Sequence, residues 1–154
     1  MTDLYLDTSA VTKRYVNEAG SAWVRRSSDP TSGNVCWISD LTRVELLAAI
    51  YGKSRAGQIT LLEAQQAEAV FRNEVTTHYQ IIPVTNAALI WAMRLVTRHP
   101  LRAYDAVQLA TALEWQALQS AYGPASLTFV SADLALNRVA ATEGLAVDDP
   151  NAHP

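Results

Sequence analysis

Four acidic residues, Asp7, Glu45, Asp105 and Asp133, lie where a carboxylate could serve a metal site. Asp7 ends the run YLD that begins at Tyr5, and Asp133 follows the run LTFVS by two residues. Either acid would also cap the helix that follows, because an Asp side chain accepts hydrogen bonds from the first free N–H groups of a helix. Cap and metal ligand therefore both stand as roles for these two residues.

Glu45 lies in the helical stretch LTRVELLAAIYGK. On a helical wheel its neighbours are Leu41, Thr42, Ala48 and Ala49, which are small or apolar, whereas a solvated face would offer charged partners. An exposed helical glutamate is the ordinary alternative. The apolar surroundings favour a carboxylate that has a partner elsewhere.

Asp105 opens the segment YDAVQLATALEW, whose first turns are apolar nearly all the way round. This pattern predicts a central, buried helix with Asp105 near its N-terminus. Burying an unpaired carboxylate is costly, so a cation is expected beside it. Arg102, three residues earlier, and a metal ion are the two candidates.

Taken together, the four acids predict a metal site. Carboxylates that converge repel one another unless a cation holds them, and hard cations such as Mg²⁺ or Mn²⁺ prefer oxygen ligands. Such a cation can activate water and assist displacement at phosphorus. The chemistry predicted is metal-assisted hydrolysis of phosphodiester bonds.

The elements that must position these acids alternate between strands and helices. Strands are predicted at residues 4–7, 34–39, 80–84, 127–131 and 145–147, and helices at residues 9–17, 21–28, 40–55, 60–78, 86–98, 103–121 and 132–143. The pattern predicts a three-layer α/β/α fold, in which roughly four to five mainly parallel strands lie between about seven helices. We expect one domain over residues 1–147 and a short tail, DDPNAHP, over residues 148–154.

Composition places the chain among folded globular proteins, with 154 residues, 49% hydrophobic and 18% charged. We expect a cytoplasmic protein with no membrane association, because no apolar run approaches a membrane span and the N-terminus does not resemble a signal peptide. Cys36 is the single cysteine, which excludes an internal disulfide. The net charge of −3 argues against nucleic acid as a partner, although a local basic patch remains open, drawn from Lys13, Arg14, Arg25, Arg26, Arg43, Arg98 and Arg102.

Two other hydrolase classes fit poorly. A haloacid-dehalogenase-like phosphatase also begins with an Asp after its first strand, but it needs a second Asp two residues later, where this chain has Ser9. The histidines, His78, His99 and His153, have no nucleophile and acid at the spacing of a triad, and no pair of them has zinc-ligand spacing.

Four segments carry a family resemblance: YLDTSAVTKRYVNEAGS, SDLTRVELLAA, LRAYDAVQLATA and FVSADLALNRVA. In this order, from about Leu4 to Val147, they resemble PIN domains, and most closely the VapC toxins of bacterial toxin–antitoxin pairs. The resemblance implies a PIN fold in which the four acids above bind Mg²⁺ or Mn²⁺. It also implies that Thr8 and Ser131 are hydroxyl residues beside the site, orienting a carboxylate or a metal-bound water.

The activity implied by the resemblance is an endoribonuclease that cuts structured RNA such as tRNA or rRNA and stops translation. The implied partners are a VapB-like antitoxin, promoter DNA reached only through that antitoxin, and a second copy of the chain in a homodimer. The amphipathic segment TLLEAQQAEAVFRNEV, from Thr60, fits a helical hairpin used for such contacts or a plain core-facing helix.

Many relatives carry a further acid where this chain has Asn137, which puts a second metal site in doubt. The alternative function is a non-catalytic PIN-fold module that binds RNA or protein.

Overall fold

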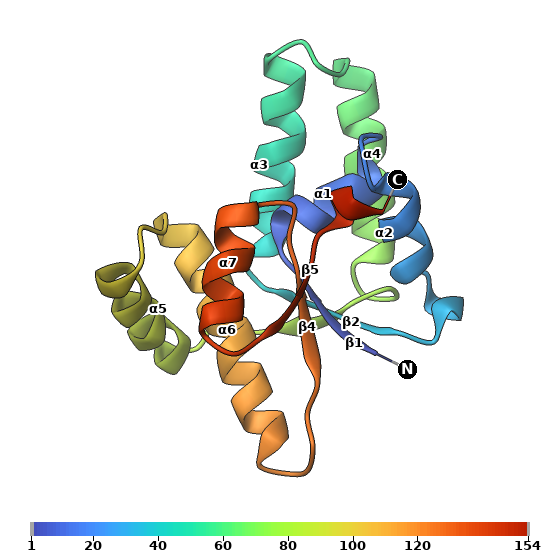
Figure 1. Ribbon diagram of the computed structural model, residues 1–154. Helices are drawn as coiled ribbons and strands as arrows, with labels where there is room; N and C mark the ends of the chain where they lie inside the picture. Colours follow the sequence, from blue (N-terminus) through green and yellow to red (C-terminus); the bar gives the residue numbers. More distant parts are fainter. Residues whose placement is uncertain (1, 154) are drawn as a thin grey trace.

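The sheet at the centre of the molecule contains five parallel strands in the order β3-β2-β1-β4-β5 (Figure 1). The computed structural model describes residues 2–153, so Met1 and Pro154 of the expected domain and tail lie outside the described residues. The strands are β1 Asp3–Leu6, β2 Val35–Ser39, β3 Gln80–Ile82, β4 Leu127–Val130 and β5 Ala146–Asp148. The predicted parallel sheet is confirmed.

Seven α-helices and two 3-10 turns connect the strands (Figure 1). The α-helices are α1 Thr8–Tyr15, α2 Ser21–Ser27, α3 Thr42–Arg55, α4 Leu61–Glu74, α5 Asn86–Arg98, α6 Ala103–Ser120 and α7 Leu134–Thr142, and the 3-10 turns are η1 Pro30–Ser32 and η2 Pro150–Ala152. Helices α3 and α4 form a hairpin that projects from the body of the molecule at the top of Figure 1. Among residues 2–153, no helix combines the length and apolar character that crossing a bilayer would require.

Hydrophobic cores lie on both faces of the sheet, because side chains alternate along each strand. In β1, Leu4 and Leu6 pack into the core beneath α1, α3 and α4, while Tyr5 packs into the core beneath α5, α6 and α7. In β4, Val130 and Phe129 divide between the two cores in the same way. The predicted α/β/α layering is confirmed.

Several helix boundaries differ from the prediction by one or two residues, and the end of α4 differs by four. The helix expected over residues 60–78 is α4, which ends at Glu74. There the backbone N–H groups of Thr77 and His78 both donate to the Glu74 carbonyl, and this turn brings Tyr79 into the core. The helix expected from residue 40 begins at Thr42.

Residues 148–153, which the prediction assigned to a short tail, pack on the domain. Asp148 belongs to β5 and pairs with Val130, and Pro150 is buried. The ring of His153 stacks on Trp23 of α2, with 4.5 Å between ring centroids. Asp148 therefore extends the sheet, and Pro150 and His153 pack against α2 and the turn before it.

Candidate active site

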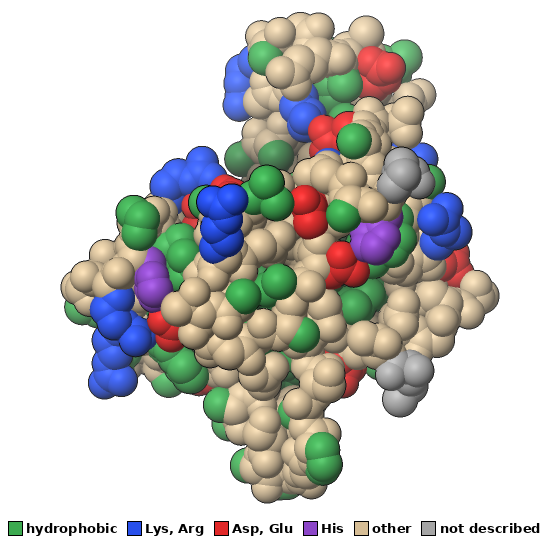
Figure 2. Space-filling view, viewed as in Figure 1, with side chains coloured by type: hydrophobic (Ala, Val, Ile, Leu, Met, Phe, Trp, Pro, Cys, Tyr) green, Lys and Arg blue, Asp and Glu red, His purple; other side chains and the backbone are tan. Residues whose placement is uncertain are grey.

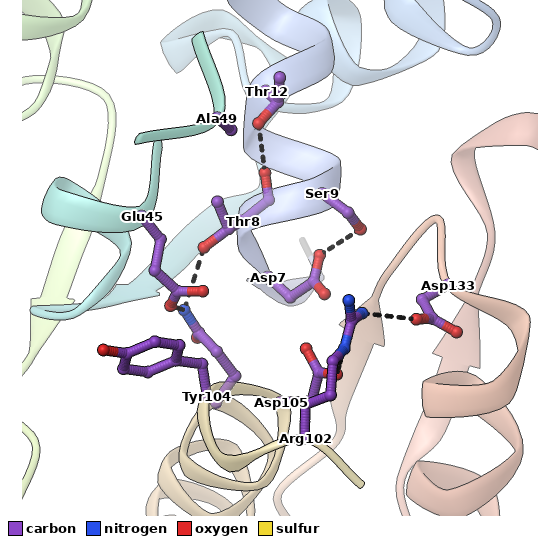
Figure 3. A pocket seen from close by; sticks show the side chains of 11 residues that line it. Asp7, Thr8, Ser9, Thr12, Glu45, Ala49, Arg102, Tyr104, Asp105 and Asp133 are labelled. Atoms are coloured by element: carbon purple, nitrogen blue, oxygen red, sulfur yellow. Dashed lines mark hydrogen bonds and ion pairs between the residues drawn. The ribbon is translucent and has the colours of Figure 1, made fainter. Parts of the chain in front are cut away.

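The four predicted acids line one cavity at the carboxyl end of the sheet, where β1 and β4 lie side by side. The chain order reverses between these two strands, since β2 and β3 lie to one side of β1 while β4 and β5 lie to the other. Ligand crevices of open parallel sheets form at such a switch point. A cavity of about 300 Å³ lies here, lined by Asp7, Thr8, Ser9, Thr12, Glu45, Ala49, Arg102, Tyr104, Asp105, Gln108 and Asp133 (Figure 3).

Asp7 is the most buried of the four acids, with 5% of its surface exposed. It caps α1, since its Oδ1 accepts the backbone N–H of Ala10 at 3.1 Å. The Ser9 hydroxyl donates to Oδ1 at 2.6 Å, and the Ser131 hydroxyl donates to Oδ2 at 2.9 Å. Burial raises the pKa of Asp7, and these hydrogen bonds oppose the rise. The carboxylate is thus held in one orientation at an energetic cost.

The two serines are themselves fixed by the loop between β4 and α7. The Ser9 hydroxyl accepts the backbone N–H of Ala132 at 2.8 Å, and the Ser131 hydroxyl accepts that of Asp133 at 3.0 Å. Each hydroxyl can therefore direct its own proton to Asp7. Ser131 lies beside the acids, as expected, whereas Ser9 is a contact that the sequence prediction missed.

Glu45 reaches the cavity from α3, which places it opposite Asp7 (Figure 3). Its Oε1 accepts a hydrogen bond from Gln108 Nε2 at 2.8 Å. Burial raises the pKa of Glu45, and the negative charges of Asp7 and Asp105 raise it further, against the lowering effect of the Gln108 bond. Thr8, also expected at the site, lines the cavity and accepts from Gln108 Nε2 at 3.2 Å.

Arg102 joins the remaining two acids. Its Nε donates to Asp105 Oδ2 at 2.8 Å, and an outer guanidinium nitrogen donates to Asp133 Oδ2 at 3.4 Å (Figure 3). Arg102, one of the two cations considered for Asp105, is therefore paired with it. Asp133 also caps α7, because its Oδ1 accepts the N–H groups of Ala135 and Leu136. The Arg102 side chain is 79% exposed, so this cation can move without unpacking the core.

Comparison with known proteins identifies the fold. The model of the PIN domain matches residues 4–141. The chain belongs to the PIN domain family. Similar solved structures are FitAcB from Neisseria gonorrhoeae (TM-score 0.64, 17% identity, 98% of this chain and 99% of that chain covered), PAE2754 from Pyrobaculum aerophilum (0.62, 17%, 98% and 91%) and VapBC2 from Rickettsia felis bound to a DNA fragment from their promoter (0.60, 14%, 96% and 98%). No curated protein matches the sequence at a significant level.

PIN domains are generally nucleases that use divalent metal ions, and the donors of this PIN domain suit such an ion. Four carboxylates line or border the cavity, and oxygen ligands are those that hard cations prefer. Among residues 2–153, no three acidic, histidine or cysteine side chains converge closely enough to chelate an ion as they stand. Mg²⁺ commonly keeps several waters and binds through one or two carboxylates. A hydrated cation held by a few of these acids therefore fits the cavity, and the full four-acid ligand set stays a prediction.

Asn137, the next polar side chain after Asp133, does not line the cavity. It is buried in α7, and its Nδ2 donates to the Ser131 carbonyl at 2.7 Å. Its Oδ1 has no hydrogen-bond partner within the described part of the chain. The side chain thus braces the loop between β4 and α7.

Basic residues are sparse around the acids. Of the seven that sequence left open for a local patch, Arg102 alone belongs to the cavity lining. Lys13 is buried against Glu18, and Arg14 is paired with Glu74. On the face seen in Figure 2, Lys and Arg side chains are scattered and form no single band.

Proposed function

We propose that this PIN domain is a VapC-like toxin, a metal-dependent endoribonuclease that cuts structured RNA such as tRNA or rRNA in the cytoplasm and so inhibits translation. The observation that carries the proposal is the convergence of Asp7, Glu45, Asp105 and Asp133, from four separate elements, on one cavity at the switch point of the sheet. Cations that stabilise phosphoryl transfer require such a set of oxygens.

Asp7, Glu45, Asp105 and Asp133 are the residues that would hold Mg²⁺ or Mn²⁺. When bound, this cation supplies activation of water and stabilisation of negative charge on the scissile phosphate. The protein's own contribution is to hold the carboxylates in place before the ion arrives.

Two groups of side chains do this in different ways. Ser9 and Ser131 fix both oxygens of Asp7 by donated hydrogen bonds. Arg102 neutralises Asp105 and Asp133, and its exposed guanidinium also suits an RNA phosphate, which it would bind in bidentate fashion. Thr8 lies between Asp7 and Glu45 and offers a hydroxyl to either substrate or carboxylate.

A VapB-like antitoxin is the proposed partner, and promoter DNA would be reached only through it. The similar structure of VapBC2 from Rickettsia felis was solved bound to a DNA fragment from its promoter. In this chain, α4 exposes Leu61, Leu62 and Val70 on the projecting hairpin, which is apolar surface available to such a partner. Homodimerisation is also proposed, and Met93 on the exposed apolar face of α5 would lie in such an interface.

The test uses purified protein freed of antitoxin and incubated with total RNA and Mg²⁺ or Mn²⁺, followed by mapping of the cut ends. EDTA and Asp7→Asn are expected to abolish the cuts. Asp29→Asn is the matched control, because Asp29 is an exposed cap of η1 and is not part of the cavity lining. Discrete cuts that persist in EDTA and in Asp7→Asn would refute the proposal. Bound RNA that is never cut would favour the non-catalytic module.

A further inference from the structure

Gln108 is a buried polar residue that joins the core of the sheet to the acidic cavity. It lies on α6, one turn after Asp105, and is 2% exposed. The Tyr5 hydroxyl donates to its Oε1 at 2.7 Å. Its Nε2 lies 2.8 Å from Glu45 Oε1, 3.0 Å from Thr42 Oγ1 and 3.2 Å from Thr8 Oγ1. No other polar side chain described above touches both the core of β1 and a cavity acid.

Tyr5 determines which way the Gln108 amide faces. The phenol is fully buried and stacks on Phe129 at 5.6 Å between ring centroids, so its hydroxyl has a fixed position. The 2.7 Å contact joins this hydroxyl to the amide oxygen, Gln108 Oε1. An amide oxygen accepts the hydroxyl proton, whereas an amide nitrogen cannot. The nitrogen of Gln108 is therefore turned toward Glu45.

This orientation matters because Glu45 is a long side chain beside other acids. The negative charges of Asp7 and Asp105 oppose the ionised form of Glu45. If no hydrogen-bond donor lay beside Glu45, this repulsion would favour rotamers that turn its carboxylate away from the other two acids. Gln108 holds Oε1 and leaves Oε2 unconstrained by this bond. Being neutral, the amide also orients Glu45 without cancelling the negative charge that a cation needs, in contrast to Arg102 at the other acids.

We propose that Tyr5 and Gln108 form a positioning relay that presents Glu45 to the divalent cation. The inference rests on the proposed function, since it assumes that Glu45 is a metal ligand. A residue that orients a ligand in this way influences metal affinity directly, and replacing such partners commonly lowers affinity about 10- to 100-fold. A purely structural role would leave the affinity of the folded protein unchanged.

The experiment measures the Kd for Mn²⁺ by calorimetry and electron paramagnetic resonance on the full chain without RNA. Gln108→Met keeps the approximate length of the side chain and removes its polar atoms. We expect it to weaken Mn²⁺ binding about 10- to 100-fold. Tyr5→Phe, which removes only the hydroxyl that orients the amide, is expected to weaken binding less. In a Glu45→Gln background, Gln108→Met should have no further effect, because the carboxylate that the relay positions is gone.

Tyr79→Phe is the matched control. Tyr79 is also a buried tyrosine, 4% exposed against 0% for Tyr5, and its hydroxyl contacts that of Tyr15, but it lies outside the cavity lining. Its Kd for Mn²⁺ should equal that of the wild type. Folded Gln108→Met and Tyr5→Phe variants that bind Mn²⁺ as tightly as wild type would overturn the relay alone. If Gln108→Met does not fold, Tyr5→Phe decides the question. A wild-type protein that binds no Mn²⁺ would overturn the metal site and the relay together.

Discussion

Ser131→Ala should destabilise the protein through its bond to the buried acid. The Ser131 hydroxyl donates to Asp7 Oδ2 at 2.9 Å and accepts the Asp133 N–H at 3.0 Å. A hydrogen bond to a charged group contributes about 1.5–3 kcal/mol, and a neutral one about 0.5–1.5 kcal/mol. Removing both is expected to lower the free energy of unfolding by about 2–4 kcal/mol. Urea unfolding in EDTA measures this change.

A double-mutant cycle with Asp7→Asn isolates the charged bond. Because the two side chains are in contact, the effects of Ser131→Ala and Asp7→Asn should depart from additivity by more than about 1 kcal/mol. Ser28→Ala is the matched control, since Ser28 is equally buried and hydrogen-bonded but touches no cavity acid. Its effect should add to that of Asp7→Asn within about 0.5 kcal/mol.

The pH dependence of the free energy of unfolding tests the same hydrogen bond between Ser131 and Asp7. Burial raises the folded-state pKa of Asp7 above its unfolded value, so the native state binds this proton more tightly and loses stability as pH rises from about 4 through the folded pKa. The Ser131 hydrogen bond lowers that pKa, and Ser131→Ala raises it further. The destabilisation should therefore be larger at pH 7 than at pH 4. Equal destabilisation at both pH values, together with additivity in the cycle, would refute the reasoning.

Three further predictions concern the rim of the cavity and the chain end. Arg102→Gln should change the free energy of unfolding by less than about 0.5 kcal/mol, because the ion pairs of Arg102 are exposed. It should also tighten Mn²⁺ binding, because the guanidinium no longer competes for two carboxylates; weaker binding in a Mn²⁺ titration would contradict this. Tyr104→Ala should weaken binding of a single-stranded RNA oligonucleotide in EDTA about fivefold or more, since Tyr104 lines the cavity and is 63% exposed for base stacking. Tyr122→Ala, outside the cavity lining, should not weaken it, and equal losses of affinity in the two variants would exclude stacking at the site. Gly20→Ala should lower the free energy of unfolding by at least about 1–3 kcal/mol in urea unfolding, because Gly20 has a φ of +80° and a Cβ there would lie 2.3 Å from the Pro150 carbonyl oxygen; unchanged stability would mean that the chain end does not pack on α2.

The acids at the ends of strands and the starts of helices could be predicted from the sequence, because local capping rules determine such positions. Asp7 and Asp133 follow strands and precede helices, and the structure confirms that both are helix caps as well as neighbours at the site. Arg102 could be named as a candidate partner of Asp105 for a similar reason, since residues three apart at a helix start lie close together.

The residues that hold the acids in place were not predicted, because their partners are distant in sequence. Gln108 contacts Tyr5 and Glu45, which are 103 and 63 residues away. Ser9 depends on the backbone of Ala132 across the β1–β4 pair. No periodicity or spacing encodes such contacts, which exist only after the strands have taken their order in the sheet.

The end of α4 and the chain terminus show the same limit. Residues 75–78 continue a helical pattern, but tertiary packing of Tyr79 ends the helix at Glu74. The segment from Asp148 resembles a linker in composition, yet Pro150 and His153 find partners on α2 and its preceding turn. Packing decides these boundaries more strongly than local propensity.

The central claim is that the carboxylates of this cavity hold the cation that the nuclease uses. The most direct measurement is anomalous diffraction at the manganese absorption edge from crystals of the protein grown with Mn²⁺, compared with crystals of Glu45→Gln. We predict a peak inside the cavity bordered by Asp7, Glu45 and Asp105, reduced or lost in the variant. A peak elsewhere on the molecule, in protein whose RNA cleavage is activated by Mn²⁺, would contradict the account.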